Sequence, residues 1–315
     1  MASLICGSVA YDTIMTFDGR FREHILPDQI HMLNVSFLVP GMRREFGGCA
    51  GNIAYTLKML GGEPLIMGTV GEDAGPYLDY LRNLGIVTDH IRTLPETFTA
   101  QAMITTDLDN NQITAFHPGA MSQSQLNSVQ DALTAGRQPA LGIVAPDSRE
   151  GMLHHAQQFA EAGVPFIFDL GQAMPLFNGE DLRQFIELAS YVTVNDYEAQ
   201  VLLSRTAWTS AEVAAKVRAF IVTHGERGAS IFADGQQYAI PAVPAEQVVD
   251  PTGCGDAFRG GLLYGIENGL DWETTGRLAS LMGALKIEHL GPQNQRFDYE
   301  QFAEYFRQQF GYALR

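Results

Sequence analysis

The chain has 315 residues, of which 46% are hydrophobic and 18% charged, an ordinary composition for a globular protein. Its net charge of −16 argues against a nucleic-acid-binding protein, because phosphate backbones are bound by clustered basic side chains. Three cysteines without a Cys-x-x-Cys pair argue against a disulfide framework and favour a reducing, cytoplasmic location.

The first third of the chain alternates short apolar runs with helical patterns. The run 4–9 predicts a strand, and it lacks the preceding basic segment of a signal peptide. Apolar residues at helical spacing predict a helix over 52–60, followed by a strand over 65–70 and a helix over 77–84. No apolar run approaches the roughly 20 residues of a membrane-spanning helix, so we expect no membrane partner.

Two stretches interrupt this alternation. Residues 13–46 are rich in Phe, Met and His, and residues 96–118 contain two strand-like runs around the turn "LDNN". The second stretch predicts a β-hairpin. Surface loops are the alternative, but the aromatic content favours a flap, or lid, over a pocket.

The remaining runs restore the alternation of strands and helices. Strands are predicted over 140–145, 165–171, 191–195, 219–225 and 229–234, and helices over 256–268, 274–288 and 299–310. This order predicts an α/β fold, a doubly wound and mostly parallel sheet flanked by helices. We expect one domain over 1–315, with a small β-sheet lid formed from about 13–46 and 96–118.

The stretch "VVDPTGCGDAFRGG", residues 248–261, carries the main chemical signal. The N–H groups of Gly253, Cys254 and Gly255 precede a helix at the edge of the sheet where ligands bind, so they can hold an anion. Asp256 follows in the first helical turn, where a carboxylate can accept a proton. The alternative is an acid that only stabilises the helix start.

Two common nucleotide-binding motifs are absent from the sequence. No Gly-Lys pair is followed by Ser or Thr, so there is no Walker A loop. Phe258 stands at the third glycine position of a dinucleotide fingerprint, and "CGSVAYD" near the N-terminus lacks one too, which argues against a dehydrogenase. Phosphoryl transfer without a P-loop needs an anion hole, a metal and a base, and this turn supplies the first and the third.

Five motifs occur in the order found in the ribokinase-type (PfkB) family of sugar and nucleoside kinases. They are "GSVAYD" (7–12), "GGCAGNIA" (47–54), "NDYE" (195–198), "THGERG" (223–228) and "DPTGCGD" (250–256). The last resembles the family's D-T-x-G-A-G-D, with Pro251 and Cys254 as departures that remove no catalytic group. The chain therefore resembles this family over most of its length.

The resemblance implies an ATP-dependent kinase. Asp256 would be the general base, and the amides of Gly253, Cys254 and Gly255 would hold the charge of the transferred phosphoryl group. A thiol at a helix start can be sensitive to oxidation, but for Cys254 we favour a small, inert buried residue.

The resemblance also implies where the phosphate donor and its metal bind. Asn195 and Glu198 would hold Mg²⁺, mostly through waters, although the same pair resembles a helix cap. Thr223, Gly225 and Gly228 would line the ATP site, or form a plain turn before the next strand. Residues 286–295 would lie near the adenine of ATP and near a site for K⁺, which stays open.

The acceptor is predicted to be a sugar hydroxyl. Asp12 can accept two hydrogen bonds from a vicinal diol, and Asn52, which follows Gly47 and Gly48, can reach the same hydroxyls. Simple helix capping is the alternative for Asn52.

A nucleoside acceptor would need an aromatic face for its base. Phe116 on the predicted hairpin is the first candidate, Gln172 is a second contact, and Phe37, Phe46 and Met42 are weaker ones. The stretches "AFHPGAM" and "FDLGQAM" resemble the nucleoside-phosphorylating branch, so we expect an adenosine kinase of purine salvage, acting as a monomer or homodimer. A ribokinase-like sugar kinase and a non-catalytic nucleoside-binding relative are the alternatives.

Overall fold

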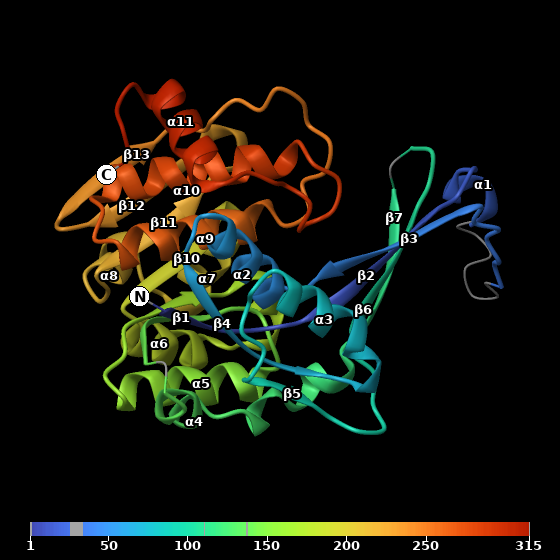
Figure 1. Cartoon of the computed structure of the whole chain (residues 1–315), viewed down its shortest axis with the longest axis horizontal. Coiled ribbons are helices and arrows are strands. Elements are labelled where there is room, and N and C mark those ends of the chain that lie inside the picture. The colour runs from blue at the N-terminus through green and yellow to red at the C-terminus, as the bar shows by residue number, and fades with distance from the viewer. Residues whose placement is uncertain (1, 26–33, 110, 137, 315) are drawn as a thin grey trace.

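A nine-stranded sheet forms the centre of the computed structural model, which describes residues 2–25, 34–109, 111–136 and 138–314 (Figure 1). Its order is β13-β12-β11-β10-β9-β8-β1-β4-β5. The strands are β1 (Ala2–Cys6), β4 (Glu63–Val70), β5 (Ile91–Thr93), β8 (Pro139–Val144), β9 (Phe166–Asp169), β10 (Tyr191–Asn195), β11 (Ala219–Thr223), β12 (Ala229–Ala233) and β13 (Gln236–Ile240). All pairs are parallel except those of β12 with β11 and β13, which confirms the predicted mostly parallel sheet.

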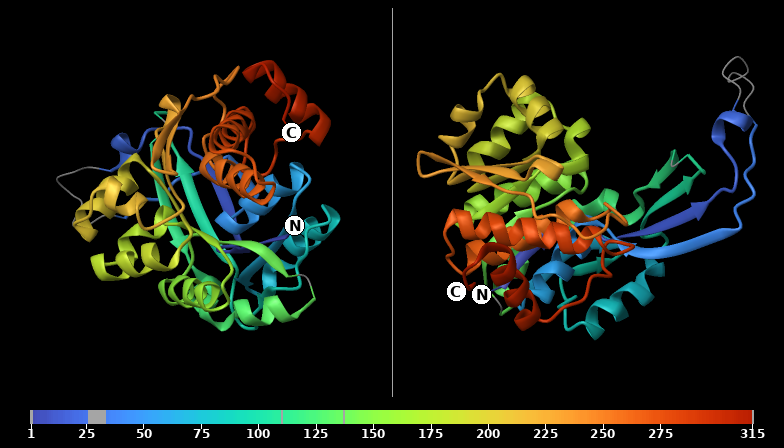
Figure 2. Two further views of the ribbon diagram at one scale, coloured as in Figure 1. Left: turned by 90° about the vertical axis from the view of Figure 1, so that its left-hand side faces the viewer. Right: turned by 90° about the horizontal axis from the view of Figure 1, so that it is seen from above.

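Helices cover both faces of this sheet (Figure 2). Successive side chains of a strand point to opposite faces, so Leu4 and Cys6 join one core while Ile5 joins the other. The first face carries α4 (Val129–Thr134), α5 (Arg149–Glu161), α6 (Gly179–Leu188), α7 (Asp196–Thr206) and α8 (Ser210–Ala214). The second face carries α2 (Cys49–Met59), α3 (Gly75–Asn83), α9 (Cys254–Glu267) and α10 (Trp272–Ile287), with α11 (Tyr299–Phe310) packed on the outside. None of the helices in the described ranges is long and apolar enough to cross a membrane.

A second, four-stranded sheet projects from the main body, as Figure 1 and the right-hand view of Figure 2 show. Its order is β3-β2-β6-β7, from β2 (Ala10–Thr16), β3 (Gly41–Gly47), β6 (Ala100–Thr106) and β7 (Gln112–His117). The predicted hairpin is confirmed, because β6 and β7 pair antiparallel. Residues 26–33 of the predicted lid stretch lie outside the described residues, and a short helix, α1 (Phe21–His24), precedes them.

The small sheet is joined to the main body at two neighbouring points. β1 continues into β2 after three residues, and β3 ends one residue before α2 begins. Gly48, between β3 and α2, has φ +84°, and a Cβ there would lie 2.6 Å from both Ser8 O and Ala10 N. Ser8 Oγ accepts a hydrogen bond from Cys49 N–H at 3.0 Å. The close approach of these two segments requires glycine and holds the small sheet at one place on the core.

Candidate active site

The anion-binding turn forms at the start of α9. Gly253 caps the helix with φ +81°, a conformation that favours glycine. Cys254 N–H donates to Pro251 O at 3.2 Å within the turn, so the prediction that all three amides face a ligand was wrong for Cys254. The N–H groups of Gly253 and Gly255 make no hydrogen bond within the described part of the chain, and they stay available to an anion.

Asp256 lies partly buried in the first turn of α9. Its Oδ2 accepts a hydrogen bond from Asn52 Nδ2 at 2.8 Å. Burial raises the pKa of Asp256 to about 6, with a further rise from Asp169, while the Asn52 bond and Arg259 oppose this rise. The carboxylate is therefore mostly ionised at neutral pH, yet basic enough to accept a proton.

A buried ion pair, which was not predicted from the sequence, supports this turn. Arg259 and Asp169 are 6% and 2% exposed and form two hydrogen bonds, of 2.9 and 2.8 Å. Arg259 Nη1 also donates to Gly255 O at 3.2 Å, which ties the end of β9 to the first turn of α9. The signal was present in the sequence as an arginine in an otherwise apolar helix and an aspartate directly after an apolar strand.

A cavity of about 540 Å³ opens beside the same turn. It is lined by predicted residues, namely Thr223, Gly225, Gly228, Cys254 and Gly255, and by apolar side chains that include Val243, Phe258, Ala284 and Ile287. An apolar cavity that reaches the unpartnered amide of Gly255 suits a molecule with a flat ring at one end and phosphates at the other. Ile287 is the part of the predicted 286–295 segment that lines it.

Asn195 and Glu198 form the helix cap that the sequence analysis gave as the alternative. Asn195 Oδ1 accepts from Glu198 N–H at 2.8 Å, and Glu198 Oε2 accepts from Asn195 N–H at 2.8 Å. In the described ranges no three His, Cys, Asp or Glu side chains lie close enough to hold a metal together. Burial and the nearby Asp169 raise the pKa of Glu198, while the Asn195 N–H and Arg259 oppose this rise.

Asp12 lies within β2 of the small sheet. It faces Gly47, where a Cβ would lie 2.4 Å from Asp12 Oδ2, and it pairs in register with Glu45. Burial raises the pKa of Asp12 to about 6, with further contributions from Glu45 and Asp250. A partly desolvated carboxylate favours a partner that donates hydrogen bonds to it.

The two main candidates for contact with the nucleobase are exposed. Phe116 is 52% exposed on β7, and Gln172 is exposed at the start of the short helix η4 (Gly171–Leu176). Within the described chain neither side chain is hydrogen-bonded to another predicted site residue. Of the weaker candidates, Phe37 packs 4.8 Å from Phe17, Phe46 stacks 4.5 Å from Tyr77, and Met42 is 72% exposed.

The Cys254 thiol is partly buried, and burial raises its pKa to about 11. The direction agrees with the small, inert residue that we favoured over an oxidation-sensitive one.

The segment predicted to lie near a K⁺ site begins with a buried ammonium group, that of Lys286. Lys286 is fully buried, and its Nζ donates to Asp250 O at 2.7 Å and to His289 O at 3.1 Å. Carbonyl oxygens of this kind are the ligands of a potassium ion, and here they already hold a cation. The residues around Lys286 therefore do not fit K⁺ at this point.

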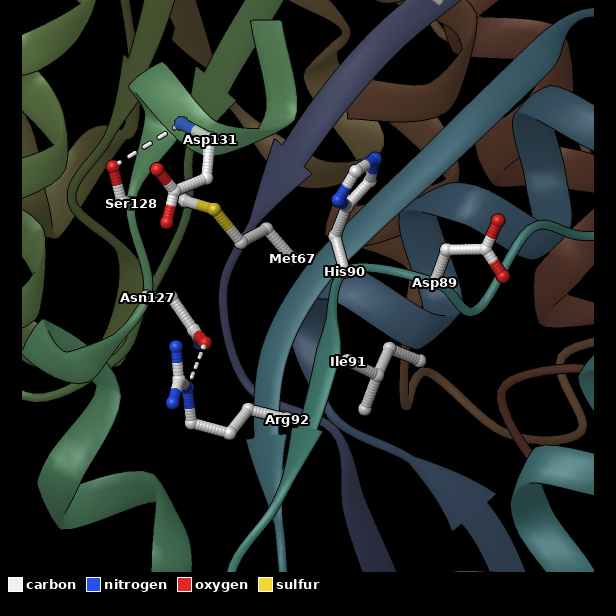
Figure 3. Close-up of a pocket in the computed structure, with 8 residues that line it drawn as sticks. All are labelled: Met67, Asp89, His90, Ile91, Arg92, Asn127, Ser128 and Asp131. Carbon is white, nitrogen blue, oxygen red and sulfur yellow. Dashed lines mark hydrogen bonds between the residues drawn. The ribbon is translucent and has the colours of Figure 1, made fainter. Parts of the chain in front are cut away.

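A second cavity, of about 300 Å³, lies at the β5 edge of the main sheet (Figure 3). Met67, His90 and Arg92 line it together with the start of α4, and Arg92 Nε donates to Asn127 Oδ1 at 3.1 Å. No residue predicted for the kinase site lines this cavity.

Comparison with known proteins places the chain among kinases. The family model described as pfkB family carbohydrate kinase matches residues 9–297. A nucleoside kinase of Methanocaldococcus jannaschii is 31% identical over 262 residues, which cover 82% of this chain and 85% of the relative. A ribokinase of Bacillus subtilis is 26% identical over 293 residues, covering 92% and 94% of the two chains.

Solved structures of a nucleoside kinase from Burkholderia thailandensis are more similar still. Its complex with inosine has a TM-score of 0.89 and 59% identity, with 99% of both chains covered. Its complex with ADP and inosine has a TM-score of 0.86 and 60% identity, covering 99% of this chain and 97% of that one.

Proposed function

Because the chain belongs to the PfkB family of carbohydrate kinases, we propose that it transfers the terminal phosphoryl group of ATP to the 5′-hydroxyl of a nucleoside. The observation that carries this proposal is the position of Asp256 in the first turn of α9, directly after Gly255, whose unpartnered amide belongs to a residue that lines the cavity of about 540 Å³. Its support from similarity is the kinase of known structure that binds ADP and inosine.

The proposed reaction uses groups of this chain at each step. Asp256 accepts the proton of the 5′-hydroxyl as that oxygen forms a bond to the γ-phosphorus, and the bond between γ-phosphorus and the β,γ-bridging oxygen breaks to release ADP. The amides of Gly253 and Gly255 hold the charge on the migrating group, a contribution on the order of 3 kcal/mol per donor. Mg²⁺ held through Glu198 and Asn195 would neutralise phosphate charge.

The proposal also assigns the contacts of the acceptor. Asp12, with Gly47 and Gly48 beside it, would bind the ribose hydroxyls, and Asn52 would lie between the ribose and the base Asp256. Phe116 and Gln172 would contact the nucleobase, and the small sheet would act as the lid of a single domain over 1–315.

A nucleoside is favoured over a free sugar by the 59% identity to the Burkholderia nucleoside kinase, against 26% to the ribokinase of Bacillus subtilis. Adenosine stays our first candidate, and inosine joins it because the Burkholderia enzyme binds inosine. A non-catalytic nucleoside-binding protein would be expected to lack the base or the amide turn, and this chain has both. ATP would bind in the cavity lined by Thr223, Gly225 and Gly228. Cytoplasmic location and the monomeric or homodimeric state stay predictions.

The experiment is ADP production from Mg·ATP with adenosine, inosine, guanosine, cytidine or ribose as acceptor. We expect turnover with at least one nucleoside, and a loss of about a thousandfold or more in Asp256→Asn with nucleoside binding retained. Asp131→Asn, which changes a first-turn acid of another helix, should retain full activity. Turnover with ribose alone would support the sugar kinase, and binding without turnover would support the non-catalytic relative.

A further inference from the structure

A chain of hydrogen bonds runs from the lid to Asp256. Tyr77 OH donates to Gly47 O at 2.8 Å, and Gln293 Nε2 donates to Tyr77 OH at 2.6 Å and to Asn52 Oδ1 at 2.9 Å. Asn52 Nδ2 then donates to Asp256 Oδ2 at 2.8 Å. The chain joins the last residue of β3, helix α3, the segment after α10, helix α2 and helix α9.

Each bond in this chain fixes the direction of the next. A backbone carbonyl can only accept, so Gly47 O takes the single proton of the Tyr77 hydroxyl. The Tyr77 oxygen is then left to accept from Gln293, which must present its Nε2. The second N–H of that same nitrogen meets Asn52, so Asn52 accepts through Oδ1 and points Nδ2 at Asp256.

The opposite orientation of the two amides is unfavourable. If Gln293 alone were flipped, its Oε1 would face Asn52 Oδ1, and two acceptors would meet. If Asn52 were flipped as well, its Oδ1 would face the carboxylate of Asp256. A buried polar contact without a proton costs about 1–3 kcal/mol, and more next to a charge. The observed orientation instead leaves one oxygen, Gln293 Oε1, without a partner in the described chain.

These side chains are shielded from solvent. Tyr77 is fully buried, Gln293 is 3% exposed and Asn52 is 5% exposed. The small sheet contacts this chain of hydrogen bonds at a second place. Phe46 of β3 stacks on Tyr77 with ring centroids 4.5 Å apart and an interplanar angle of 23°. The position of β3 is thus transmitted to Tyr77 through a hydrogen bond and through ring packing.

We infer that Tyr77 and Gln293 are positioning residues that hold the Asn52 amide in the orientation that donates to Asp256, and that they tie this orientation to strand β3 of the lid. The inference rests on the proposed function for the role of Asp256. Neither residue contacts the reacting atoms; both act through Asn52.

The experiment compares Tyr77→Phe and Gln293→Leu with the control Tyr55→Phe. Tyr55 OH is also buried and donates to Gln295 O at 2.6 Å, so the control removes a similar bond to the same segment but leaves the chain intact. In the two test variants we expect kcat to fall about tenfold or more, while the KM for nucleoside changes less than about threefold. The control should match the unmodified protein.

The second readout is the titration of Asp256, followed by carbon-13 NMR of Asp-labelled protein and assigned with Asp256→Asn. The groups that face Asp256 are Asn52 and Cys49 on α2, Arg259 on α9 and Asp169 on β9. Since only the Asn52 bond is disturbed, the pKa of Asp256 should rise by about half a unit or more in both test variants. The acid limb of the kcat profile should move to higher pH with it.

The outcomes separate this inference from the proposed function. A rise in the Asp256 pKa in a protein that phosphorylates no nucleoside would keep the positioning role and overturn the proposed function. An unchanged Asp256 pKa with normal kcat in both test variants would overturn the positioning role and keep the kinase. Equal losses in the control would reduce Tyr77 and Gln293 to structural residues and also overturn the inference.

Discussion

Burial raises the pKa of Asp256, and the hydrogen bond from Asn52 lowers it. The balance of these two effects sets the proton affinity of the carboxylate. Its pKa of about 6 lies above the ordinary aspartate value of 3.8. The folded protein thus binds this proton more tightly than the unfolded chain does. The stabilisation that the proton gives is complete below about pH 4, and it is lost as the pH rises through about 6.

Asp256→Asn should therefore be more stable than the unmodified protein at neutral and alkaline pH. We expect its Tm at pH 8 to exceed that of the unmodified protein by about 2 °C or more, because no buried charge forms. The difference should shrink as the pH is lowered to 5. Asp131→Asn, whose parent side chain is exposed, serves as the control in the same thermal scans. A Tm difference that does not vary with pH would contradict the raised pKa.

Phe116 tests the nucleobase contact at the scale of one side chain. Phe116→Ala should lower kcat/KM for nucleosides about tenfold more than for ribose, since ribose has no base to lose a stacking partner. Ile113→Ala is the matched control, because Ile113 is 42% exposed on the same strand and three residues away, hence on the opposite face. Equal losses with ribose and nucleosides would mean that Phe116 only packs the lid.

Motif residues close to one another in sequence were predictable, but their partners across the fold were not. Asn52 and Asp256 were both identified, yet their mutual hydrogen bond joins positions 204 residues apart. Tyr77 and Gln293 gave no local signal, because a buried tyrosine or glutamine is recognised only by the group it meets. Cys254 N–H was misjudged because the bond that closes its turn depends on backbone geometry, not on side-chain type.

At the scale of elements, hydrogen bonds of Asp250 and Lys286 join α10 to the turn before α9. Asp250 Oδ1 accepts from Thr252 N–H and Oδ2 from Gly291 N–H, both at 2.9 Å, while its carbonyl accepts from Lys286. Burial lowers the pKa of Lys286, and the carboxylate of Asp250 opposes that change. The buried ammonium group of Lys286 thus helps to hold the anion-binding turn in place.

This arrangement predicts how the protein responds to monovalent ions. Turnover should change less than about twofold when K⁺ is replaced by Na⁺, since Lys286 supplies the positive charge. Lys286→Met should lower Tm and kcat, because two buried carbonyl groups lose their donor. Part of that kcat should return when K⁺ or NH₄⁺ is added to the variant. Activation of the unmodified protein by K⁺ would contradict this prediction.

Elements with strong periodicity were predicted well. The predicted helix over 299–310 matches α11, and the predicted strand over 191–195 matches β10. The polar strand β13 was missed because "QQYAI" has too few apolar residues to signal a strand at an edge. The first strand begins at Ala2 and ends at Cys6, so both ends of the predicted strand over 4–9 were too late. The apolar run continues past Cys6 into the connection to β2.

At the scale of the whole molecule, alternating strands and helices were enough to predict the layered sheet. The order of the small sheet was not predictable. Strands β2 and β6 pair in parallel although 83 residues separate Thr16 from the start of β6 at Ala100, and no local pattern encodes that register. Burial on two faces fixes the main sheet, whereas β7 is exposed along its whole length and carries little apolar alternation.

The glycine crossing at Gly48 makes the two attachment points of the small sheet a single mechanical unit. β1 leads into this sheet and β3 leads out of it in close contact, so a displacement at the base of the sheet also reaches the segment that begins with Cys49 and holds Asn52. A side chain at position 48 would push these two segments apart, and it would disturb Asn52 together with the sheet.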